Sequence, residues 1–111
     1  MSDALTTRDL RRIVRCLRDG APAGDVRVMR RPLVDALALA SIRGGRARIA
    51  VDPRLGFDAA WLVLPHEWGH VLAWRRHGVE IQDHGDEWGI AQADATRALE
   101  REWARRGWRD C

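Results

Sequence analysis

The sequence predicts a single α+β domain with an N-terminal helix, about three mainly antiparallel strands, a central helix and a C-terminal helix. Apolar residues recur at helical spacing in residues 6–19, 58–77 and 86–106, whereas apolar and polar residues alternate, as in strands, within residues 26–51. Glycine or proline lies between these segments. Because 111 residues suffice for one modest core, we expect residues 1–111 to form one domain.

The N-terminal helix is expected from Thr6 to Asp19. Thr6 and Asp9 have the spacing of a capping box, in which the first side chain accepts a hydrogen bond from the backbone three residues later. One side of the helix is apolar and is formed by Leu10, Ile13, Val14 and Leu17. The other side consists of arginines, which we interpret as a solvated surface: Arg8, Arg11, Arg12, Arg15 and Arg18.

Residues 26–51 are expected to form the strands, which would cover one side of the central helix. The most specific signal is Gly44-Gly45 between two alternating runs, because such a turn is typical of a hairpin. In the strand after this turn, Arg46 and Arg48 would share one face, and the other face would carry Ala47, Ile49 and Val51. An edge strand beside an active-site cleft would be able to hold an extended peptide by strand addition.

The central helix is expected from about Asp58 to His77, with Gly78 as its C-cap. Pro65 lacks the amide hydrogen that a helix interior needs, so we expect a kink or a fresh helix start there. Gly69 lowers helix propensity by roughly 1 kcal/mol relative to alanine. Its expected benefit is the close approach of another backbone or of a substrate.

The C-terminal helix is expected from about Asp86 to Arg106, and the acidic residues of its first turn favour the helix dipole. Its apolar stripe, which should pack on the central helix, comprises Trp88, Ala91, Ala95, Leu99 and Trp103. The tryptophans assigned to the core are Trp61, Trp74, Trp88 and Trp103. Trp68 is expected to line a cleft beside Glu67.

The central helix carries the run His66-Glu67-Trp68-Gly69-His70. Histidines four residues apart lie on one face of a helix, about 6 Å apart along its axis, so both imidazoles can reach one zinc ion. Glu67 then points beside the ion, where it can take a proton from a zinc-activated water. This H-E-x-x-H motif is typical of zinc hydrolases, and it makes His66 and His70 candidate ligands and Glu67 the candidate general base.

A catalytic zinc ion usually has three protein ligands, so a third is needed. His84 is the preferred candidate, because Gly78 can end the central helix and the short segment after it lets the chain turn back. Glu87 and Asp83 remain alternatives, and Asp94 is less suitable. The carboxylates that would be able to orient a ligand imidazole are Asp83, Asp86 and Asp94.

The two motifs His66-Glu67-Trp68-Gly69-His70 and His84-Gly85-Asp86-Glu87-Trp88 resemble those of the SprT-like zinc metallopeptidases, which include the Spartan proteases acting on DNA–protein crosslinks. The resemblance covers roughly residues 26–105, although only the motif residues are specific. It implies a zincin-like fold and a third histidine ligand at His84. Asp86 replaces the usual proline, and the C-terminal zinc ribbon of longer members is missing. The chain is also similar to short phage and bacterial proteins with both motifs.

These residues predict a zinc-dependent peptidase that hydrolyses protein or peptide substrates through a zinc-activated water, with Glu67 as general base. Two other classes stay open: a zinc hydrolase acting on another substrate, and a non-catalytic, zinc-stabilised binding module for which the arginines suggest nucleic acid. The oxyanion-stabilising group is not identified, because tyrosine is absent and only His77 or an arginine remains. The physiological substrate and the oligomeric state are also open.

Composition limits the partners and the location. All 19 basic residues are arginine, and a pI near 10 with a formal net charge of +3 favours nucleic acid or acidic partners, though weakly. No apolar run approaches the ~18 residues that cross a bilayer, and no signal-peptide core is present, so we expect a cytoplasmic protein without a membrane partner. Cys16 is expected to be buried and Cys111 a free thiol, without a bridge between them.

Overall fold

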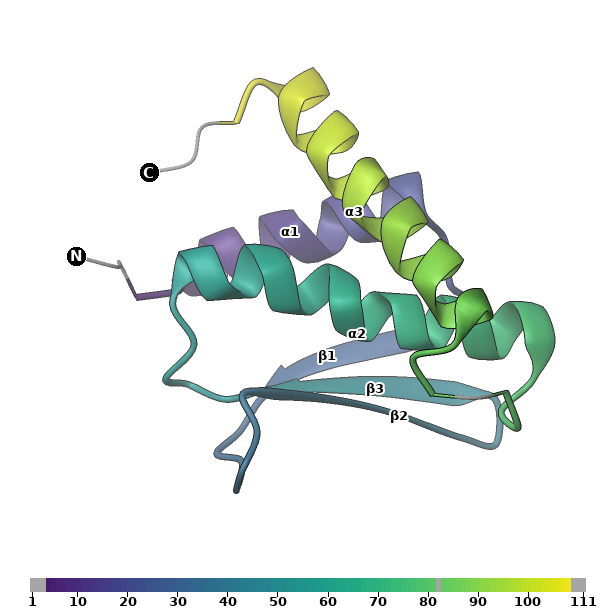
Figure 1. Cartoon of the computed structure of the whole chain (residues 1–111). Helices are drawn as coiled ribbons and strands as arrows, with labels where there is room; N and C mark the ends of the chain where they lie inside the picture. The colour runs from purple at the N-terminus through teal and green to yellow at the C-terminus, as the bar shows by residue number, and fades with distance from the viewer. Residues whose placement is uncertain (1–3, 82, 109–111) are drawn as a thin grey trace.

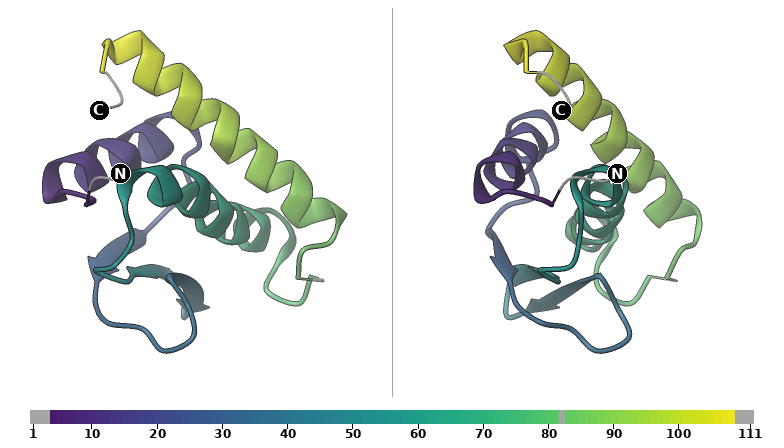
Figure 2. Two further views of the ribbon diagram at one scale, coloured as in Figure 1. Left: turned by 60° about the vertical axis from the view of Figure 1, so that its left-hand side comes forward. Right: turned by 90° about the vertical axis from the view of Figure 1, so that its left-hand side faces the viewer.

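Figure 1 shows the chain as a computed structural model, which describes residues 4–81 and 83–108. Within these residues, three helices and one three-stranded mixed sheet form an α+β fold, as expected. In chain order the elements are α1 (Thr7–Gly20), β1 (Val26–Arg30), β2 (Ala38–Arg43), β3 (Arg46–Val51), α2 (Phe57–His77) and α3 (Asp86–Arg106). All three helices lie on one side of the sheet, with α2 between the sheet and α3 (Figures 1 and 2).

The sheet has the strand order β1-β3-β2 and is mixed rather than mainly antiparallel. β2 and β3 form the expected antiparallel hairpin at Gly44-Gly45, but β1 pairs with β3 in parallel. The reason is that residues 31–37 carry the chain past the position of β3 to the far edge of the sheet. β3 thereby occupies the centre, where both sides of its backbone find a partner. Its inner face is buried, as expected, and consists of Ala47, Ile49 and Val51.

The helix boundaries agree closely with the expected ones. Thr6 caps α1, since its Oγ1 accepts a 3.0 Å hydrogen bond from the amide of Asp9. α2 continues through Pro65, so the alternative of a fresh helix start at that residue is wrong. Pro65 removes one hydrogen bond from the helix, because it has no amide hydrogen. Its ring is fully buried, so it contributes packing to the core at the same place. Gly107 ends α3 with φ 71°, a left-handed conformation that favours glycine.

Two residues between the histidines of α2 determine how this helix packs. At Gly69, an added Cβ would lie 2.7 Å from the Cα of Gln92 in α3, which confirms the expected close approach of another backbone. Trp68 is fully buried, and its Nε1 donates a 2.7 Å hydrogen bond to the carbonyl of Ala21. The expectation that Trp68 lines a cleft is therefore wrong, because its side of α2 faces the connection between α1 and β1.

The remaining expectations about the interior are largely confirmed. Trp103 is buried, and three more tryptophans pack half-buried against the core: Trp61, Trp74 and Trp88. Cys16 is a fully buried thiol, whereas Cys111 lies outside the described residues. Within residues 4–81 and 83–108, no helix combines the length and the apolar character that a membrane crossing requires.

Candidate metal centre

Three histidines from two parts of the chain meet at one side of α2. His66 and His70 lie one helical turn apart on α2, and His84 belongs to the connection between α2 and α3. One ring nitrogen of each lies within 4.8 Å of the corresponding atoms of the other two. The Nε2 atoms of His66 and His84 are 3.4 Å apart. The structure therefore brings together the three residues that the sequence singled out, and together they could hold a metal ion.

The connection between α2 and α3 brings His84 back to the first helix. Gly78 ends α2, and its amide donates a 2.8 Å hydrogen bond to the carbonyl of Trp74. His84 itself has φ 57°, in the left-handed region that residues other than glycine seldom occupy. Gly85 follows as the N-cap of α3. A strained residue of this kind persists only where surrounding contacts hold it, and here it is also a candidate ligand.

Trp88, which the sequence assigned only to the core, forms a wall of the histidine cluster. Its Nε1 donates a 3.3 Å hydrogen bond to the carbonyl of His66. Its ring centroid lies 4.9 Å from that of His66, 5.5 Å from that of His70 and 4.7 Å from that of His84. The sequence feature that could have indicated this role is the position of Trp88, four residues after His84 at the start of α3. Trp88 therefore limits how far the three imidazoles can move.

The surroundings favour neutral imidazoles. Burial lowers the pKa of His66, and the neighbouring His84 lowers it further. Burial also lowers the pKa of His70, with His66 and His84 acting in the same direction and Asp83 in the opposite one. The Asp83 carboxylate lies 3.8 Å from Nδ1 of His70, beyond hydrogen-bond distance. Neutral imidazoles bind metal ions, so the electrostatics suit ligation.

Glu67 lies between two candidate ligands in sequence and faces the sheet. Burial raises the pKa of its carboxyl group to about 7, against a backbone hydrogen bond from Ala40 of β2; the charge of Asp83 raises it further. Glu67 and His66 line the same cavity of about 700 Å³. The rest of its wall comes from the segment before β2, from β2 itself, from the connection between β3 and α2, and from α2: Asp35, Ala36, Leu37, Ala38, Arg54, Leu62 and Val63. The candidate base and one candidate ligand therefore face the same open space.

The other residues considered as ligands are not part of the cluster. Among the described residues, only the three histidines form a group close enough to share a metal ion, so Glu87 and Asp83 are not brought into it. Asp94 instead accepts hydrogen bonds from Arg76 at 2.8 Å and from Arg97 at 2.7 Å. Of the carboxylates expected to orient an imidazole, Asp83 is the one found beside a ligand.

Comparison with known proteins identifies no relative of this chain. No protein-family model, curated protein or solved structure matches the chain. The resemblance to the SprT-like metallopeptidases therefore depends on the two motifs and on the way the fold brings their histidines together.

Proposed function

We propose that this protein is a zinc-dependent metallopeptidase with a zincin-like fold of the SprT-like type. The observation that carries the proposal is the convergence of His66, His70 and His84, with Glu67 in the cavity that His66 also lines. Three neutral nitrogen ligands with a fourth position open to solvent are typical of catalytic zinc, whereas structural sites are closed by four protein ligands. A purely structural site would have no need of Glu67.

In this proposal the three imidazoles would hold the ion, and Trp88, which packs against all three rings, limits their movement. When bound, zinc polarises the substrate carbonyl and makes a water molecule acidic enough to lose a proton near neutral pH. The Glu67 carboxylate accepts that proton and then transfers it to the leaving amine.

The substrate would lie along β2, the edge strand beside the cavity. An extended peptide can add to such an edge through backbone hydrogen bonds, which leaves its side chains free to enter pockets. The cavity wall is largely apolar, and large apolar residues on or near it are strongly exposed: Leu37, Leu39 and Leu62. This arrangement favours cleavage next to an apolar residue.

Zinc content and peptide hydrolysis, measured together on a small set of variants, test the proposal. We expect one zinc ion per chain in the wild type, loss of zinc in His84→Ala, and retained zinc with strongly reduced hydrolysis in Glu67→Gln. His77→Ala is the matched control, because His77 is an exposed histidine at the end of the same helix and lies outside the cluster.

Two results would contradict the proposal in different ways. Full zinc retention in His84→Ala would remove His84 from the ligand set. A zinc-loaded wild type that cleaves no member of a mixed peptide library would exclude the peptidase and leave a metal-binding domain.

A further inference from the structure

The outer face of the sheet, which the helices do not cover, carries four exposed arginines. Alternation along the strands sends Ala47 and Ile49 of β3 into the core and turns Arg46 and Arg48 outward. The same alternation places Arg27 of β1 and Arg43 of β2 on this side. We call Arg27, Arg43, Arg46 and Arg48 the outer arginine set.

The strand register places these arginines directly opposite one another. Arg43 is the partner of Arg46 across the β2–β3 pair, and Arg27 is the partner of Arg48 across the β1–β3 pair. Like charges at directly opposite positions destabilise a sheet, and opposite charges stabilise it. The sheet therefore holds two repulsive pairs at the hairpin end of one face. An anion bound there would relieve both.

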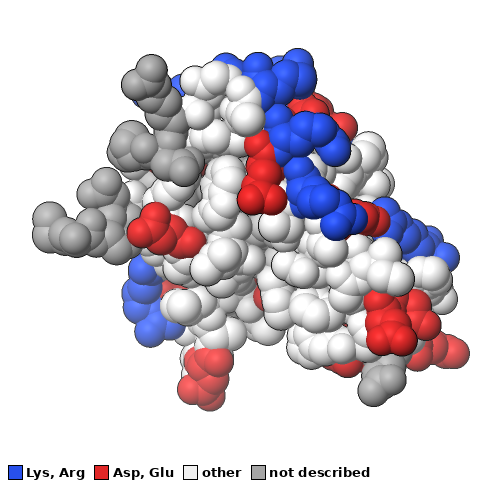
Figure 3. Space-filling model, turned by 45° about the horizontal axis from the view of Figure 1, so that its top comes forward, with Lys and Arg blue, Asp and Glu red and all other residues white. Residues whose placement is uncertain are grey.

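The described residues provide little compensation for this charge. No side-chain hydrogen bond or ion pair joins the outer arginine set to any residue in 4–81 or 83–108. The exposed Asp25 borders the same hollow of about 230 Å³ as Arg27, Arg46 and Arg48, and it is the acidic residue there. The arginines of α3, in contrast to the outer arginine set, form ion pairs with acidic neighbours. Figure 3 shows basic and acidic side chains next to one another on the helical side.

A second basic surface lies between α1 and β1, but it is partly occupied by the protein itself. Arg11, Arg15, Arg18 and Arg30 line a cavity of about 690 Å³ there. Arg18 donates a 2.6 Å hydrogen bond to the carbonyl of Val26, and Arg30 donates one to the carbonyl of Leu5. Only Arg11 and Arg15 of this surface are left without such a contact among the described residues, so the outer arginine set is the stronger anion site.

We propose that the outer arginine set binds the phosphate backbone of a nucleic-acid strand. Guanidinium groups match the geometry of phosphate oxygens, and Arg46 and Arg48 stand about 6.6 Å apart along β3, which suits a repeating anion better than a single one. The strands at residues 26–30, 38–43 and 46–51 contain no aromatic ring on which a base would stack, so we expect binding without base preference. The inference does not depend on the metal centre, which lies on the helical side.

The test is fluorescence anisotropy of a labelled single-stranded DNA of about 20 nucleotides, titrated with metal-free protein over a range of salt concentrations. We expect the logarithm of the affinity to fall with the logarithm of the salt concentration with a slope of about −3, from four phosphate contacts. Arg46→Gln/Arg48→Gln should reduce that slope by about 1.4 and weaken binding roughly tenfold at low salt. Because these changes remove repulsion, the melting temperature should rise or stay constant.

The matched control is Arg11→Gln/Arg15→Gln, which removes the same charge from α1. We expect it to change the affinity by less than a third of the change in the outer-face variant. Equal loss in both variants would overturn the proposal, because general positive charge would then explain binding. Tighter binding of polyglutamate than of DNA of equal charge would also overturn it, in favour of an acidic protein partner. Thymidine and adenine oligomers that differ more than about tenfold in affinity would overturn binding without base preference.

Discussion

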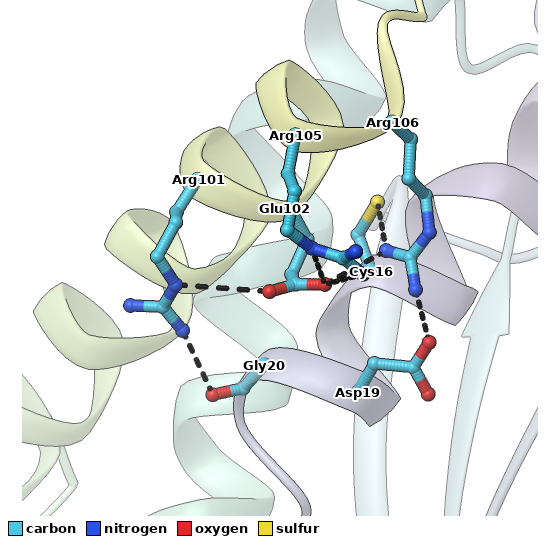
Figure 4. Close-up of polar contacts among 7 residues, drawn as sticks. All are labelled: Cys16, Asp19, Gly20, Arg101, Glu102, Arg105 and Arg106. Carbon is cyan, nitrogen blue, oxygen red and sulfur yellow. Dashed lines mark hydrogen bonds and ion pairs between the residues drawn. The ribbon is translucent and has the colours of Figure 1, made fainter.

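Each end of α3 carries a cluster of polar side chains, and the two clusters differ in how many hydrogen-bond partners the protein provides. Near its C-terminal end, Glu102 is almost buried and is surrounded by arginines (Figure 4). Its Oε1 lies 2.9 Å from Arg105 and 3.1 Å from Arg106, and its Oε2 lies 3.7 Å from Arg101. The hydrogen bond from Arg105 is the main reason why the pKa of Glu102 is lowered.

Arg106 extends this network to α1. It pairs with Asp19, and it donates a 3.4 Å hydrogen bond to the Sγ atom of Cys16, whose pKa burial raises (Figure 4). Arg101 donates a 3.4 Å hydrogen bond to the carbonyl of Gly20 (Figure 4). The protein therefore supplies every partner that Glu102 needs, and the network joins α3 to α1.

The histidine cluster at the N-terminal end of α3 lacks a comparable set of hydrogen-bond and ion-pair partners among the described residues. Its rings meet edge to face, with centroid separations of 5.2 Å for His66–His70 and 4.8 Å for His70–His84. The nearest carboxylate oxygen in an ion-pair contact lies 3.8 Å away, and burial works against protonation. A polar cluster whose hydrogen bonds are all made within the protein stabilises the fold, whereas a convergent cluster that lacks such partners suits an external ligand.

The largest expected effect separates the two glutamates. Glu67→Gln should lower peptide hydrolysis by about 10²–10⁴-fold, the usual contribution of a general base, and should leave the melting temperature and zinc content nearly unchanged. Glu102→Gln should lower the melting temperature, because it breaks the arginine network. It should leave peptide hydrolysis and zinc content nearly unchanged, because the metal centre stays intact. Hydrolysis assays, elemental analysis and thermal unfolding of both variants measure this contrast. Equal loss of activity in the two would remove the distinction between the clusters.

Zinc itself should produce the next largest effect. A ligand that binds only the folded state stabilises it by about 4 kcal/mol when present at a thousand times its dissociation constant. We therefore expect zinc to raise the melting temperature of the wild type and of Glu102→Gln, and to leave that of His70→Ala unchanged. An equal zinc-induced rise in His70→Ala would show that the ion binds elsewhere.

Two glycines lie where helices pack closely beside the two clusters: Gly69, where α2 meets α3, and Gly20, where α1 meets α3. An added Cβ at Gly69 would lie 2.7 Å from Gln92 Cα, and one at Gly20 would lie 2.8 Å from Ala98 Cβ. Overpacking of this kind costs roughly 1–3 kcal/mol, so both alanine variants should unfold more easily. Only Gly69→Ala should also weaken zinc binding, because it pushes α3 and Trp88 away from α2.

Gly89→Ala provides the control for this pair, since an added Cβ there meets no atom within 4 Å. It should raise the free energy of unfolding by about 0.5–1 kcal/mol through helix propensity alone. Unchanged zinc affinity in Gly69→Ala would contradict the view that the contact between α2 and α3 positions the cluster.

Asp52 extends the comparison to a third place, where a carboxylate is again saturated. It accepts 2.8 Å hydrogen bonds from the amides of Leu33 and Arg54, and the Arg54 side chain donates two more, at 2.8 and 3.2 Å. The hydrogen bonding from this side chain is the main reason that the pKa of Asp52 lies well below its usual range. The resulting stability is complete above the unfolded pKa near 3.8 and is lost as the pH falls from there toward the lower folded pKa.

We therefore expect Asp52→Asn to be less stable than the wild type at neutral pH and the difference to shrink steadily below about pH 4. Denaturant unfolding at several pH values measures this small effect. A difference that does not depend on pH would show that the Asp52 charge contributes nothing beyond its hydrogen bonds.

The local parts of the fold could be predicted because their causes are local. The cap at Thr6, the turn at Gly44-Gly45 and the end of α2 at Gly78 depend on residues a few positions apart. The neighbouring positions of His66 and His70 follow from the helical repeat in the same way. These features would be visible in any fold that contained the same segments.

From the amino acids alone, the helix boundaries, the hairpin and the pair His66 and His70 with Glu67 between them could be predicted, and His84 could be ranked first among the candidates for a third ligand. The parallel pairing of β1 with β3, the burial of Trp68 and the wall that Trp88 forms beside the histidines became clear only from the folded structure, which also selected His84 over Glu87 and Asp83 as the third histidine-cluster residue. The physical reason is that these features depend on contacts between distant segments. Local spacing constrains such contacts only weakly, so packing selects among them.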